Sequence, residues 1–225
     1  NVIVDNCKVF KGHGGFVVGS EMSGGVRNVS VSNCQFMGTD VGLRFKSTRG
    51  RGGVVENIYA NHINMFDIIT DSFLFDLYYG GKSASESLDD GDVTPIDETI
   101  PAVTEETPAF RNIYVKNLVS RNARRALFFN GLPEMNISNI NVENAYITAN
   151  YGAELSESKD IVLKNVTIIP ENGPALLLNN VKNTKIDNFS SPDLSTIVKI
   201  TGTRNNNIQL PESMNKQKVK SLVQK

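Results

Sequence analysis

The chain has 225 residues, which is enough for one domain with a sizeable core. Its 23 basic and 24 acidic residues nearly cancel, so no overall electric field favours nucleic acid or an anionic membrane surface. No run of about 20 apolar residues exists, so we expect neither a membrane-spanning helix nor a membrane or nucleic-acid partner.

A six-residue frame recurs along the chain from its first residue. It reads Asn or Asp, an apolar residue, a variable one, a usually apolar one, a polar one, and Asn in nearly every copy. Alternation of apolar and polar positions predicts a short strand with one buried face. The frames begin 21 to 29 residues apart, with one interval of 55, and span residues 1–6, 28–33, 57–62, 112–117, 139–144, 160–165 and 183–188.

A second apolar patch follows most frames, at residues 16–18, 43–45, 73–77, 126–129, 176–178 and 197–200. Short strands with Asn- and Gly-rich turns at this period predict an all-β fold, a right-handed parallel β-helix of about seven to eight coils. Asn tolerates the left-handed backbone that coil corners need, and stacked Asn side chains can hydrogen-bond as a ladder. Leucine-rich repeats are disfavoured because their leucine consensus is missing, and a β-sandwich is the remaining alternative.

The repeats define one domain over residues 1–204, with a loop insertion at residues 80–108. Residues 205–225 are expected to form a last strand and a Lys-rich tail. The acidic run Asp89–Asp92 in the insertion lacks the spacing of a calcium loop, so we expect a solvated loop there. Two His and two Cys, widely separated, predict neither a metal site nor a cofactor.

The two cysteines occupy equivalent positions of the repeat. Cys7 and Cys34 each lie six residues after the start of a frame, which places them on adjacent coils about 4.8 Å apart. Their side chains then run parallel, which disfavours a disulfide. We therefore expect two buried free thiols.

Two short motifs lie one repeat apart. Sliding the chain by 27 residues places Phe16–Gly19, which follows Gly12-His13-Gly14, on Leu43–Lys46. Arg44 and Lys46 alternate with apolar residues and are expected to face outward, where an Arg fork suits a carboxylate. The alternatives are an ordinary turn histidine and a pair of solvated strand charges.

The segments GHGGFVVGSEMSGG and GLRFKSTRGRGG, on this Asn frame, resemble the polygalacturonase family, glycoside hydrolase family 28, in its bacterial branch. The resemblance implies inverting hydrolysis of α-linked galacturonic acid, with a pectic polysaccharide or oligogalacturonide as the partner. It gives His13 a catalytic role beside the acids, and it gives Arg44 and Lys46 the binding of the uronate carboxylate.

The resemblance also suggests further substrate-binding residues, each with an alternative interpretation. Tyr79 is the candidate subsite tyrosine, and Tyr78 is its competitor. Arg49 and Arg51, in the Gly-rich loop, are candidates for binding neighbouring sugar carboxylates, or are solvated loop cations. Glu21 is interpreted as a turn residue slightly more readily than as a substrate contact.

The family's catalytic aspartates lie upstream of its Gly-His-Gly motif, where this sequence offers only Asp5, on a solvated face of the repeat. We therefore expect an N-terminally truncated glycosidase from the periplasm or the extracellular space, inactive alone. Missing N-terminal coils, or a second copy, would cover its open N-terminal end. The alternatives are a non-catalytic binding module for acidic oligosaccharides and a structural or adhesive β-helix domain.

Overall fold

The computed structural model describes residues 1–80 and 99–222. Its regular structure is almost entirely strand, apart from one short 3-10 helix, η1, at Lys216–Lys218. The strands are β1 (Val2–Asp5), β2 (Lys8–Phe10), β3 (Phe16–Val18), β4 (Val26–Met37), β5 (Leu43–Lys46), β6 (Val54–Phe66), β7 (Asp71–Asp76), β8 (Ala109–Asn130), β9 (Ile137–Ser156), β10 (Ser158–Asn179), β11 (Lys182–Ser190), β12 (Val198–Thr201), β13 (Asn206–Gln209) and β14 (Val219–Leu222).

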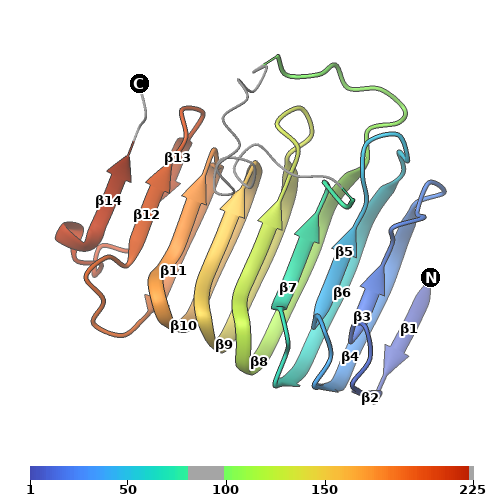
Figure 1. The fold of residues 1–225 in the computed structure, drawn as a ribbon, viewed down its shortest axis with the longest axis horizontal. Coiled ribbons are helices and arrows are strands. Elements are labelled where there is room, and N and C mark those ends of the chain that lie inside the picture. Colours follow the sequence, from blue (N-terminus) through green and yellow to red (C-terminus); the bar gives the residue numbers. More distant parts are fainter. Residues whose placement is uncertain (81–98, 223–225) are drawn as a thin grey trace.

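The strands pair in parallel with their equivalents one coil away. The main path runs β1-β4-β6-β8-β9-β10-β11-β13, which gives eight rungs. Figure 1 shows these strands stacked side by side from the N-terminal to the C-terminal end. The predicted parallel β-helix is therefore confirmed, and the 27-residue slide is confirmed by the pairing of Phe16 with Leu43 and Val17 with Arg44.

The coil corners are made by asparagine in the left-handed conformation, as the frame predicts. Asn28 and Asn33, at the two ends of one frame, have φ of 58° and 54°. Their equivalents one coil away are Asn57 and His62, also at positive φ. The side chains form the predicted ladder, since Asn57 Nδ2 donates to Asn28 Oδ1 and Asn112 Nδ2 donates to Asn57 Oδ1. These asparagine corners are thus fixed by both backbone preference and stacking.

Aromatic side chains fill the middle of the core. Phe45, Phe73, Phe75, Phe110 and Phe129 are each 1% exposed or less. Their rings pack edge-on or tilted, and the centroid of Phe75 lies 4.9 Å from those of Phe45 and Phe129. Such pairs stabilise the core beyond their buried area. They also give the strands that carry outward-facing residues a rigid base.

One outer face of the β-helix carries the candidate site. We call it the site face; it consists of β3, β5, β7, β12, β14 and the final segments of β8, β9 and β10. Each strand places alternate side chains outward, and equivalent positions stack about 4.8 Å apart. Residues far apart in sequence therefore meet as rows across this face.

The structure describes only parts of the two segments that the repeats set apart, the insertion at 80–108 and the segment 205–225. The insertion at 80–108 falls largely on residues 81–98, so its Asp89–Asp92 run lies outside the described residues. Beyond residue 204, β13 pairs with β11 and β14 pairs with β12, so pairing continues to residue 222. No helix among the described residues is long and apolar enough to cross a membrane.

The expectation of two buried thiols is half wrong. Both cysteines are free, but Cys7 is exposed and only Cys34 is buried. Cys7 lies on the first coil, which has a neighbouring coil on one side only within the described residues. An equivalent position in the repeat therefore sets the direction in which a side chain points. Its burial also depends on whether a coil lies on each side of it.

Candidate active site

His13 stands between a carboxylate and a guanidinium on the site face. Its Nδ1 lies 2.6 Å from Asp40 Oδ2, and its Nε2 lies 2.8 Å from Arg44 Nη1. Arginine only donates, so Nε2 must accept. The proton of the neutral imidazole is then on Nδ1, where it is donated to Asp40. This arrangement fixes the tautomer and the direction of the ring.

Arg44 and Lys46 meet Tyr79 from the next coil. The ammonium nitrogen of Lys46 lies 4.1 Å from the centroid of the Tyr79 ring, and the guanidinium carbon of Arg44 lies 5.8 Å from it. Both distances are within cation–π range. Arg44 is half-buried, whereas Lys46 is 9% exposed. The structure thus brings together His13, Arg44, Lys46 and Tyr79.

The glycines beside this cluster are needed by the chain itself. A Cβ on Gly14 would lie 2.3 Å from Cγ2 of Val17, and one on Gly19 would lie 1.9 Å from the carbonyl oxygen of Lys46. Gly19 also has a φ of +100°, which other residues rarely adopt. Gly19 allows the first coil to pack tightly against the strand that carries the two cations, and Gly14 leaves room for Val17 within the first coil.

Arg49 is directed at a carboxylate of the same chain. Its Nε lies 2.5 Å and its Nη2 2.9 Å from the two oxygens of Glu134, whose side chain is 2% exposed. The Glu134 carboxylate raises the pKa of Arg49 further. The guanidinium also lies 5.2 Å from the centroid of Tyr78, and burial raises the pKa of that phenol. Arg49, Glu134 and Tyr78 therefore form a unit that joins two loops.

Arg51 also finds a partner within the chain. Its Nη1 lies 3.2 Å from Oε1 of Glu21, whose side chain is 87% exposed. This is a weak surface ion pair, and such pairs contribute little to stability. Neither Arg49 nor Arg51 contacts the His13 cluster through any interaction seen here. The two loop arginines are thus separate from the four residues that the structure brings together.

Asp40 is the site residue that sequence reasoning missed. It lies 27 residues after His13, which is the same interval that aligns the two motifs. The signal was therefore present, since the slide that places Val17 on Arg44 also places His13 on Asp40. Asp5, by contrast, is exposed and lies apart from the cluster. Hydrogen bonds from Ser32 and then Asn33 lower its pKa.

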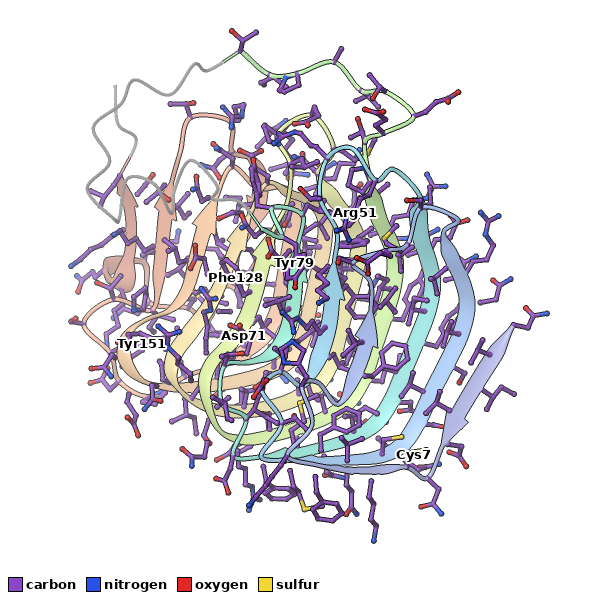
Figure 2. All side chains as sticks on the ribbon, turned by 45° about the vertical axis from the view of Figure 1, so that its right-hand side comes forward. Cys7, Arg51, Asp71, Tyr79, Phe128 and Tyr151 are labelled. Carbon is purple, nitrogen blue, oxygen red and sulfur yellow. The ribbon has the colours of Figure 1, made fainter. Side chains whose placement is uncertain are left out.

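A second polar group lies farther along the same face and was also missed. Arg125 Nε lies 2.6 Å from Asp71 Oδ1, and Arg125 Nη1 lies 3.2 Å from Glu154 Oε2. Figure 2 shows Phe128 beside Tyr79 and Asp71 below them, with Tyr151 farther to the left. Among the described residues, no group of three or more His, Cys, Asp or Glu side chains is placed to hold a metal ion.

Eight rungs of parallel strand with a polar cluster on one outer face define a solenoid protein of the parallel β-helix class. The model of the glycosyl hydrolases family 28 matches residues 1–119, which is more than half of the chain. The chain belongs to this family.

Two relatives agree with that assignment. A polygalacturonase of Ralstonia nicotianae is 36% identical over 89 residues, covering 38% of this chain and 16% of the relative. A probable polygalacturonase of Vitis vinifera is 25% identical over 130 residues, covering 58% of this chain and 23% of the relative. The chain thus spans less than a quarter of the length of either relative. No solved structure matches the chain significantly.

Proposed function

We propose that this chain forms the sugar-holding part of the cleft of a polygalacturonase-like hydrolase that acts on pectic polysaccharide. One observation carries the proposal. Arg44 contacts an imidazole nitrogen and a tyrosine ring, whereas Arg49 and Arg125 contact carboxylates of the chain. A guanidinium held in place without a carboxylate partner among residues 1–80 and 99–222 suits the carboxylate of a galacturonic acid unit.

Each residue of the cluster has a role in this proposal. Arg44 and Lys46 bind the uronate carboxylate, and Tyr79 holds the Lys46 ammonium while it packs against the sugar ring. His13 contacts Arg44 and is fixed by Asp40. It thereby positions the guanidinium beside the reacting bond. Arg49 is not among the proposed binding residues, because it is paired with the buried Glu134 carboxylate. Arg51, whose partner Glu21 is exposed, is a candidate for binding a sugar farther from the reacting bond.

Hydrolysis itself needs more than this cluster. Inversion requires two carboxyl groups about 6.5–9.5 Å apart, one as general acid and one as base for water. Asp40 is held by His13, and Asp5 is held by Ser32 and Asn33. We propose that the acid and base are residues outside these 225, which makes this chain alone inactive.

The closest rival is a binding module that holds acidic oligosaccharides without cleaving them. Incubation of the 225-residue protein with polygalacturonate, followed by measurement of reducing ends, tests whether this chain cleaves alone. The two readings differ in whether a longer chain that supplies acid and base gains turnover, which only the hydrolase reading expects. Calorimetry with trigalacturonate measures binding in parallel. Binding without turnover is the expected result for this chain. Turnover would overturn the proposed absence of acid and base, and the absence of binding would overturn the role of Arg44.

The third candidate is a structural or adhesive β-helix. The first coil favours some end-to-end contact, since Val2, Ile3 and Phe10 are 53%, 81% and 65% exposed. We propose that further coils or a second copy cover this apolar surface, because solenoids need covered ends. We also place the protein in the periplasm or outside the cell, where pectic polysaccharide is found.

A further inference from the structure

A cavity of about 250 Å³ lies on the site face, beyond the Arg44 cluster. Its position follows from the register of the strands. Arg44 lies beside Leu74 on β7, and Leu74 lies beside Phe128 on β8. Phe128 in turn lies beside Glu154 on β9, which lines the cavity. Three coil spacings of about 4.8 Å place the cavity roughly 14 Å from Arg44.

The floor of the cavity is made by small residues. Gly152 and Ala153 lie there, and a Cβ on Gly152 would come within 2.3 Å of the carbonyl oxygen of Pro174. The wall comes from a shift in strand register between Asn172 and Leu176, which breaks the regular pairing of β10 with β9. The hollow is therefore built by the backbone itself, so it exists before any ligand arrives.

The charges that line the cavity balance one another. Arg125 contacts the carboxylates of both Asp71 and Glu154, and its guanidinium lies 3.5 Å from the centroid of Phe128. Arg124, at the edge of the cavity, is exposed. Among the described residues that line the cavity, two anions and two cations leave no net charge. Inside the cavity an incoming carboxylate would meet two carboxylates and Arg125, which already contacts both, so Arg124 at the edge is the cation left to attract it.

The remaining surface suits an uncharged sugar ring. Tyr151 is 50% exposed and lines the cavity, which gives an aromatic face for the apolar side of a pyranose. The oxygens of Glu154 can accept hydrogen bonds from sugar hydroxyls while Arg125 holds the carboxylate in place. The volume matches one ring rather than a longer stretch of glycan.

We infer that this cavity binds one uncharged pyranose unit. The cavity thus differs in chemistry from the uronate-binding cluster around Arg44. That both sugars belong to the same glycan rests on the proposed function. The pocket itself does not, since its floor, its aromatic wall and its balanced charges are independent of Arg44.

The test uses backbone amide signals of tyrosine in the ¹⁵N-Tyr-labelled chain, which has six tyrosines. Tyr79→Phe and Tyr151→Phe each remove one signal and so assign the reporters for the two sites. The probes are the methyl glycosides of galactose, xylose and rhamnose, together with galacturonate. Galactose and galacturonate share a ring and differ in charge at C6.

We expect at least one neutral glycoside to shift the Tyr151 signal saturably without moving that of Tyr79. Galacturonate should move Tyr79 and leave Tyr151 in place. The inference is overturned if no neutral glycoside moves Tyr151, or if galacturonate moves it as strongly. Failure of the proposed function looks different, because galacturonate would then leave Tyr79 unmoved whatever happens at Tyr151.

Two variants test the cavity more closely. Tyr151→Ala, which lacks the Tyr151 reporter and is measured by calorimetry, should weaken neutral-glycoside binding by about threefold to tenfold, as expected for loss of an aromatic contact. Glu154→Gln should let galacturonate shift the Tyr151 signal, because it removes one anion and frees part of Arg125. Glu171→Gln is the control, since Glu171 contacts Asn150 and does not line the cavity. A Glu154 variant that still excludes galacturonate would contradict the charge argument.

Discussion

Nδ1 of His13 lies 2.6 Å from Oδ2 of Asp40, one coil away along the β-helix. With Nε2 accepting from Arg44, this contact places the imidazole proton on Nδ1. Neutral His13 should therefore show the Nδ1–H tautomer in two-bond ¹H–¹⁵N spectra. The preference should weaken in Asp40→Ala and disappear in the double variant with Arg44→Ala. His62, whose Nε2 lies 3.4 Å from Asn117 Nδ2, is the internal control, because its signals should stay unchanged in these variants. An Nε2–H tautomer at His13 in the unmodified protein would contradict the geometry.

Arg44→Ala should weaken the binding of trigalacturonate by about 10- to 150-fold, which corresponds to the loss of about 1.5–3 kcal/mol for a hydrogen bond to a charged group. Calorimetry on the 225-residue chain measures this. Arg27→Ala is the matched control, because Arg27 is a 60% exposed cation on another face, with a carboxylate 3.9 Å away. Equal affinities for the Arg44 variant and the original chain would remove Arg44 from the binding site.

Arg49→Ala should destabilise the fold, because it leaves the buried Glu134 carboxylate without its partner. We expect a loss of about 2–4 kcal/mol in the free energy of unfolding, toward the lower end because Arg49 is partly exposed. Urea denaturation measures it. Arg51→Ala, which removes an exposed pair, should change stability by less than about 0.5 kcal/mol. If the two variants are equally stable, the Arg49–Glu134 pair has no structural role.

The two cysteines should differ in reactivity toward a thiol reagent. Cys7 is exposed, whereas burial raises the pKa of Cys34 and so lowers its thiolate fraction at any given pH. One thiol should react rapidly in the folded protein and both after unfolding, and Cys7→Ser should abolish the rapid phase. Cys34→Ala should leave it intact. Two rapid thiols, or none, would contradict the burial seen here.

Two substitutions of one corner asparagine separate the contribution of the left-handed backbone from that of the side-chain hydrogen bonds. Asn144 has a φ of 57°, donates to Asn117 and accepts from Asn165. Asn144→Gly keeps the backbone permissible and loses the side-chain bonds, at a cost of about 1 kcal/mol. Asn144→Ala should lose about 2–3 kcal/mol, because left-handed strain is added. Thermal or urea unfolding distinguishes them, and equal losses would show that strain is unimportant at this corner.

The fold could be predicted from the sequence because each coil repeats one local requirement. A corner needs a left-handed residue, and Asn28, Asn33 and Asn57 meet that need at the spacing of the coil. The same register locates much of the site, since a fixed offset of 27 residues links His13 to Asp40 and Val17 to Arg44. Repetition thus converts sequence distance directly into spatial contact.

The remaining contacts depend on loops, where no register applies. Arg49 reaches Glu134 across 85 residues, and both lie in segments that leave the repeating frame. Nothing in the sequence indicates that the Arg49 guanidinium is already occupied. The cavity near Tyr151 depends on a register shift in β10, which breaks the pattern used for prediction. Departures from the repeat therefore create the specific features of this chain.

The asparagine ladder has a direction. Where asparagines at neighbouring corners hydrogen-bond to each other, the side-chain amide of one coil donates to the amide oxygen of the coil before it, as Asn139 does to Asn112 and Asn188 does to Asn165. His62 interrupts one row and Asp160 the other. Each run of stacked asparagines therefore directs its donors toward the N-terminal coils and its acceptors toward the C-terminal coils. Two copies that met through identical ends would place donors against donors or acceptors against acceptors. Only a head-to-tail junction continues the ladder, so longer stacks of such coils grow with a single polarity.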